Sequence, residues 1–130
     1  MSSISVRVKM GDFISSLQQW TQELSANVDA RTQEAGINVH AQARIACPVG
    51  TPESTHKKGY HGGRLRNSIA YANRGYGHSE VFSEVYYADF VENGHRTRNG
   101  GFVAGRFMLT NAFINERATW KQDLKDMCQP

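Results

Sequence analysis

The residues best suited to chemistry are five histidines, two cysteines and a carboxylate in a basic segment. His56 and His61 lie close together in a Gly-rich stretch, but no cysteine pair accompanies them, and their spacing fits no zinc site. Cys47 and Cys128 lie far apart without a CxxC partner, so we expect two free, buried or idle thiols. We therefore expect no metal and no cofactor.

Glu92 and His95 form the one pair that suggests catalysis, because a carboxylate and an imidazole at this spacing can share a pocket as general acid and base. Neither a nucleophile motif nor a phosphate-binding Gly loop accompanies them, so we expect no enzyme. A hydrolase with metal- or pH-dependent turnover remains an alternative. Beside Arg96, Arg98 and Arg106, Glu92 is better suited to an ion pair with an arginine of its own subunit or the next. Glu92→Gln would then weaken assembly.

Two stretches of the chain contain basic residues and no acid: one between Glu53 and Glu80, the other between Glu92 and Glu116. They are either two solvated loops or a basic face directed at a polyanion or an acidic partner. No recognition helix or RNA-binding motif is present, so we expect at most non-specific contact with phosphates.

One long N-terminal helix must position much of the chain. Residues 3–9 alternate as in a half-buried strand, and Asp12 is a candidate N-cap for a helix over Phe13–Ala46, which Pro48 ends. Gly36 is the expected kink. At about 50 Å such a helix would overhang a domain of this size unless it bends or neighbouring subunits cover it. We interpret the first four turns of its apolar stripe as core packing. The stripe comprises Phe13, Leu17, Trp20, Leu24, Val28, Thr32, Ala35, Val39, Ala43 and Ala46.

The remaining residues predict a small antiparallel sheet and a second helix. A mobile loop over residues 48–63 precedes one helical turn at Arg64–Ile69, and Ile69–Arg74 pairs with Val81–Tyr87 as a hairpin. Tyr87–His95 is predicted as a strand end that closes in a tight turn at Asn93-Gly94. A last helix spans Phe107–Met127. Its predicted apolar face contains Leu109, Ala112, Phe113, Trp120, Leu124 and Met127, and its water-facing side contains Glu116, Arg117, Lys121, Asp123, Lys125 and Asp126.

These elements predict a single α+β domain over residues 1–130, with a small antiparallel sheet packed against a long N-terminal helix and a C-terminal helix. The mean hydropathy of −0.55 indicates a thin core, which suggests that part of the apolar surface is buried between subunits. The sequence contains no membrane span and no signal peptide, so we expect the protein to stay in the cytoplasm where it is made.

The order of several short segments resembles a known family. In turn come ACPVGT after the long helix, GRLRNSI from Gly63, YADFVENGH from Tyr87, and FMLTNA at the start of the last helix. This order resembles the neck (head–tail joining, or tail-completion) proteins of long-tailed bacteriophages and prophages, over residues 35–127. The insertion Pro52–Gly62, and Arg106 where a proline is common, depart from the family pattern.

The resemblance implies a non-catalytic virion protein that assembles in the host cytoplasm and becomes part of the neck. It implies a ring of six or twelve copies that joins the head-closure (adaptor) protein to the tail terminator or tail tube protein and surrounds the DNA passage. An alternative is a small basic protein that binds nucleic acid non-specifically. The candidate residues for the subunit interface or the lumen are Arg64, Arg66, Tyr87, Glu92, His95, Arg96, Arg98 and Arg106.

Overall fold

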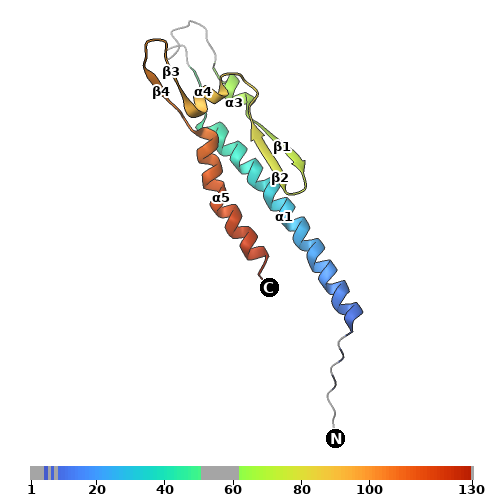
Figure 1. Ribbon diagram of the computed structural model, residues 1–130. Coiled ribbons are helices and arrows are strands. Elements are labelled where there is room, and N and C mark those ends of the chain that lie inside the picture. The colour runs from blue at the N-terminus through green and yellow to red at the C-terminus, as the bar shows by residue number, and fades with distance from the viewer. Residues whose placement is uncertain (1–4, 6, 8, 51–61, 130) are drawn as a thin grey trace.

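The first element of the structure is one long helix, α1 (Met10–Ala46). The computed structural model describes residues 5, 7, 9–50 and 62–129. Figure 1 shows the shorter elements and the second long helix gathered along the C-terminal part of α1. In chain order these elements are α3 (Arg64–Ser68), β1 (Ala70–Gly75), β2 (His78–Phe82), α4 (Ala88–Asn93), β3 (Gly94–Arg96), β4 (Phe102–Ala104) and α5 (Met108–Met127).

The start of α1 differs from the prediction. The helix begins at Met10 with Lys9 at the N-cap position, so Asp12 lies inside the first turn instead of capping it. A carboxylate there still interacts favourably with the helix dipole. Of the strand predicted over residues 3–9, positions 5, 7 and 9 belong to no strand, and the other positions lie outside the described residues.

Gly36 does not kink α1, which continues through it as regular helix. A Cβ at this position would lie 2.6 Å from the Ser79 hydroxyl oxygen and 2.7 Å from the Tyr71 ring. The glycine therefore lets the sheet approach the helix backbone closely, a use that outweighs its cost to the helix.

Strands β1 and β2 form an antiparallel hairpin, as predicted, with Ala70 opposite Phe82 and Gly75 opposite His78. The second strand is His78–Phe82, so it begins and ends earlier than the predicted Val81–Tyr87. Its turn is fixed on α1 by polar contacts. The Tyr76 hydroxyl donates to the carbonyl of Ser25 at 2.9 Å. A second bond, of 2.7 Å, runs from the Gly77 amide to the Asp29 carboxylate. These bonds dock the hairpin near the middle of α1.

Helix α5 runs antiparallel to α1 (Figure 1). The two helices are joined by an ionic cluster in which Arg31 and Glu116 are buried. Arg31 of α1 donates to Asp123 at 2.7 Å and to Glu116 at 3.0 Å. Burial alone lowers the pKa of the Arg31 guanidinium, but the hydrogen bonds and charges of the two carboxylates outweigh burial and raise that pKa. The prediction that Glu116 faces water is therefore wrong, whereas Asp123 pairs with Arg31 and remains 42% exposed.

The core lies where the C-terminal part of α1 meets α3, β1 and the first turns of α5. It consists of Val39, Ala43, Cys47, Leu65, Ile69, Met108 and Ala112. The predicted α+β class, with a small antiparallel sheet against a long N-terminal helix and a C-terminal helix, is confirmed. Both cysteines are free, as predicted, with Cys47 buried and Cys128 exposed.

The segment predicted as a strand end over Tyr87–His95 is instead the short helix α4 followed by strand β3. Only Gly94 of the Asn93-Gly94 pair has a positive φ, of +84°. Strands β3 and β4 form a second hairpin, with His95 opposite Val103, within the acid-free stretch between Glu92 and Glu116. The predicted helical turn is confirmed as α3, whereas most of the mobile loop predicted over 48–63 lies outside the described residues.

Candidate functional site

The candidate residues named from the sequence gather at one end of the molecule. They lie on or beside α3, α4 and the β3–β4 hairpin, which Figure 1 shows together at the end opposite the N-terminus of α1. The five arginines of this basic end are exposed, and no described carboxylate pairs with them. They are Arg64, Arg66, Arg96, Arg98 and Arg106.

Glu92 has a different role from the one predicted. Its side chain is buried and both carboxylate oxygens contact the first turn of α5. It accepts from the Leu109 amide at 3.0 Å, and from the amide and hydroxyl of Thr110 at 2.8 and 2.7 Å. The prediction that Glu92 pairs with an arginine is therefore wrong within its own subunit, since backbone amides at a helix start take the place of a guanidinium.

The possible catalytic pair does not form among the described contacts. His95 is exposed and lies edge-on to Phe90, with 5.9 Å between the two ring centroids. The carboxylate of Glu92 instead accepts hydrogen bonds from backbone amides of α5. Tyr87 is half-buried, packs against the core and meets Tyr86 edge-on at 5.1 Å. The three residues therefore share a region of the fold without sharing a pocket.

The segments that carry the family resemblance meet in one core. Leu65 and Ile69 come from the GRLRNSI segment, and Met108 and Ala112 come from FMLTNA. Tyr87, Ala88 and Val91 of the YADFVENGH segment pack against them, as does Cys47 of ACPVGT. The backbone links the last two segments further, because the amides of Arg106 and Phe107 donate to the carbonyls of Val91 and Glu92. The residue types shared by these motifs therefore serve packing and helix capping.

An exposed apolar surface lies at the other end of the molecule, where the long helix extends beyond its domain; the sequence predicted such an excess of length but not which turns are exposed. Every residue of α1 from 10 to 23 is exposed, and Figure 1 shows this part of α1 extending past the hairpin and past the end of α5. We call it the overhang. Phe13 is 58% exposed, Leu17 48% and Trp20 47%. The interpretation of these first four turns as core packing is wrong. Beside them, Met10 and Ile14 are also exposed.

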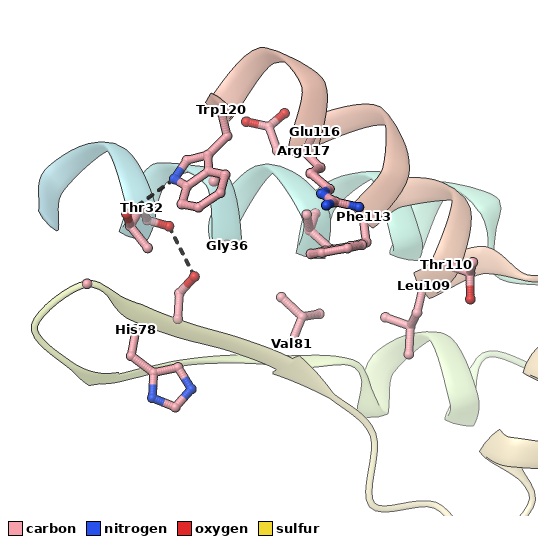
Figure 2. Close-up of a pocket in the computed structure, with 14 residues that line it drawn as sticks. Thr32, Gly36, His78, Val81, Leu109, Thr110, Phe113, Glu116, Arg117 and Trp120 are labelled. Atoms are coloured by element: carbon pink, nitrogen blue, oxygen red, sulfur yellow. Dashed lines mark hydrogen bonds between the residues drawn. The ribbon is translucent and has the colours of Figure 1, made fainter. Parts of the chain in front are cut away.

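The second feature that the sequence did not reveal is an open groove of about 530 Å³ between α1, β2 and α5. Its floor is the middle of α1, around Gly36, as Figure 2 shows. One wall is β2, with Val81, and the other is α5, with Phe113 and Trp120 (Figure 2). The Trp120 indole donates to the Thr32 hydroxyl at 3.2 Å, which fixes the ring against the floor. We call this the α1/β2/α5 groove.

The ionic cluster beneath α5 had a signal in the sequence. Glu116 lies four residues from Ala112 and four from Trp120, so helical spacing places it on the apolar face. Within that face, a carboxylate requires a partner. Its partner Arg31 lies next to Thr32 of the apolar stripe of α1, and Asn38 donates to the same Glu116 oxygen at 3.1 Å.

Two negative findings concern the described residues. They contain no group of three or more His, Cys, Asp or Glu side chains placed to hold a metal ion. None of their helices combines the length and the apolar character that crossing a membrane requires.

Comparison of the chain with protein-family models, with curated proteins and with solved structures gives no match.

Proposed function

We propose that this protein is a structural subunit of a bacteriophage neck, which forms a ring between the head-closure protein and the tail. The ring surrounds the passage through which the DNA leaves the head. The proposal combines the resemblance of residues 35–127 with the surfaces that the fold exposes. It assigns the chain no catalytic step.

The observation that carries the proposal is the overhang. Fourteen consecutive exposed residues at 1.5 Å each extend α1 by about 21 Å beyond the elements that pack on it. Five of these residues are large and apolar. Half-exposed side chains of this size present roughly 100 Å² each, or roughly 500 Å² in total, and an apolar patch of this size is often a site of interaction with another molecule. Such a surface is expected of a subunit that neighbours complete.

The basic end supports contact with DNA or an acidic neighbour. Its five arginines are exposed. Glu92, the acidic residue that precedes the β3–β4 hairpin most closely in the sequence, is buried and hydrogen-bonded to α5. The positive charge of this end is therefore available to phosphates in a lumen or to carboxylates on an adjoining ring. The same charge favours the second candidate function, a small protein that binds nucleic acid non-specifically.

The test is the mass of the purified protein in solution, alone and with the head-closure and tail proteins encoded by the same phage or prophage. A ring, or a monomer that becomes a ring when a partner is added, supports the neck function. Phage that lack the protein should then accumulate filled heads and free tails, which electron microscopy detects. A monomer that binds no virion protein but binds DNA at low salt would instead establish the second function. Its affinity for DNA should then fall steeply as the salt concentration rises.

A further inference from the structure

The overhang and the α1/β2/α5 groove are two open apolar surfaces on the same rigid helix. The overhang ends at residue 23, whereas the groove floor begins at Thr32. Because α1 is helical throughout, its N-terminal turns cannot fold back onto its own middle. If an overhang occupies the groove, it must therefore belong to a second copy of the protein.

We propose that the overhang of one copy lies in the α1/β2/α5 groove of the next copy. This inference deepens the proposed function, on which it rests for the biological setting, because it names the contact that joins neighbouring subunits. It is tested on the purified chain alone, so its outcome does not depend on any phage partner.

The apolar residues of the overhang are arranged as such a contact requires. Met10, Phe13, Leu17 and Trp20 follow one another at steps of three, four and three, which places them on one side of α1. The half-buried Leu24 continues this stripe just beyond the overhang. A single stripe of this kind fits a groove with two walls, as in other helix-in-groove contacts.

The groove offers a matching lining. Val39 on its floor, Val81 on the β2 wall, and Leu109 and Phe113 on the α5 wall are apolar. Phe113 is 55% exposed although it lines the groove, so an entering helix would cover it. In Figure 2 the labelled side chains of the two walls stand apart above the α1 floor, on either side of the open groove.

The charges of the two surfaces are complementary. The overhang contains Asp12 and Glu23 and no basic residue. In the groove, Glu116 is neutralised by Arg31, whereas Arg117 is exposed. Lys121 continues the exposed positive charge along α5. An acidic helix is therefore attracted to this groove, and two overhangs placed side by side would repel each other.

The contact would make each copy both donor and acceptor. Because the overhang and the groove are different surfaces, the interface is heterologous, and repetition gives a ring where the rotation closes. The groove and overhang are then buried in every copy of a closed ring, and no apolar end remains exposed.

The test uses one variant of each surface. Leu17→Glu with Trp20→Glu places two charges in the overhang, at side chains that are about half exposed and lie outside the buried core. Phe113→Glu places one charge in the groove at a half-exposed position. We expect each variant to self-associate more than about 100-fold more weakly than the wild type, since a charged, hydrated side chain would replace an apolar one that the contact buries. Sedimentation equilibrium measures this change, and circular dichroism verifies folding.

Mixing the two variants gives the decisive result. The intact overhang of the Phe113→Glu copy fits the intact groove of the Leu17→Glu/Trp20→Glu copy, so an equimolar mixture should form a 1:1 heterodimer and nothing larger. A mixture that stays monomeric would overturn the inference. So would a wild type that is monomeric at every concentration, or a Phe113→Glu variant that associates normally because overhangs pair with each other.

Matched controls come from exposed apolar residues on the same helices. Ile45 of α1 lies outside the overhang, and Ile114 of α5 lies outside the groove lining, yet both are more than half exposed. Ile45→Glu and Ile114→Glu should associate as the wild type does; equal losses in these controls would contradict the assigned contact. Arg117→Glu provides a second groove variant that does not depend on Phe113. Self-association that behaves as described, in a chain that binds no head or tail protein, would refute the neck function and leave this inference standing.

Discussion

Glu92 holds the first turn of α5 by accepting hydrogen bonds from the amide and the hydroxyl of Thr110, eighteen positions later in the chain. The residue that precedes α5, Phe107, has a left-handed backbone with φ of +50° and supplies no side-chain cap. The cap therefore comes from α4, and the carboxylate also meets the positive end of the α5 dipole. This contact ties α4 and α5 into one unit.

Replacement of Glu92 by glutamine should destabilise the fold by about 1–2 kcal/mol, because the amide accepts fewer bonds and carries no charge toward the helix start. Urea unfolding measures the loss. Asp89→Asn is the control, since Asp89 is exposed on the same helix and bonds only the Asn93 side chain among described residues. It should change stability by less than about 0.5 kcal/mol. Equal effects of the two variants would contradict the capping role. Any weakening of assembly by Glu92→Gln would then follow from weaker folding.

The buried cluster of Arg31 should matter far more than the exposed ion pair on the hairpin. Glu116→Ala leaves the Arg31 guanidinium buried with one fewer partner, and we expect a loss of about 3 kcal/mol in the free energy of unfolding. The comparison is Glu80→Ala, which removes an exposed 2.7 Å pair with Arg74 and should cost less than about 1 kcal/mol. Thermal and urea unfolding of both variants test this; comparable losses would show that burial of the Arg31 pair adds nothing.

Alanine should have opposite effects at the two glycines of α1. At Gly36 the new Cβ would lie within 2.7 Å of Ser79 and Tyr71, so the hairpin must move, and we expect a net loss of about 1–2 kcal/mol. At Gly11 nothing lies within 4 Å, so the better helix propensity should stabilise the fold by up to about 1 kcal/mol. Urea unfolding determines both signs. A stabilising Gly36→Ala would disprove the close approach of the hairpin.

Cys47 predicts a loss of stability in alkaline solution. Burial raises the pKa of its thiol above the ordinary value of 9.0, although the charge of Arg66 opposes this. Below pH 9 the thiol is protonated in both the folded and the unfolded chain, so its contribution is fully present. Above pH 9 the unfolded thiol ionises first, which favours unfolding until the folded thiol ionises as well.

We therefore expect the free energy of unfolding to fall more steeply above pH 9 in the wild type than in Cys47→Ala. Urea unfolding at a series of pH values compares the slopes. Identical slopes would contradict the raised pKa. The exposed Cys128 provides an internal reference, since a thiol reagent should modify it quickly and Cys47 only when the chain unfolds.

The elements with regular patterns could be predicted from the sequence. The stripe of α1 has a steady helical period, and the β1–β2 hairpin alternates around a Gly-rich turn. Helix α4 could not be identified, because six residues, ADFVEN, are too few to distinguish a helix from a strand end. In the structure, this segment is held by long-range hydrogen bonds: the carbonyls of Val91 and Glu92 accept from the amides of Arg106 and Phe107.

The candidate site could be predicted only in part for a related reason. Periodicity shows which face of α1 is apolar, but it does not show how far α5 reaches along that face. The cluster of Arg31 with Glu116 and Asp123 sets the register of the two helices, and it joins residues 85 and 92 positions apart. The lengths of the overhang and the groove follow from that register, so neither surface is visible in the local sequence.

The pairing of α1 with α5 also sets the order of events when the chain folds. The side of α1 that faces α5 cannot be covered until residues 108–127 have been synthesised, and the ring of Trp120 and the carboxylates that neutralise Arg31 arrive only then. Closing so long a loop is slow relative to local helix formation. During synthesis, therefore, α1 remains without its partner for most of the time that the chain takes to emerge, and slower translation would extend the period in which chaperones must shield it.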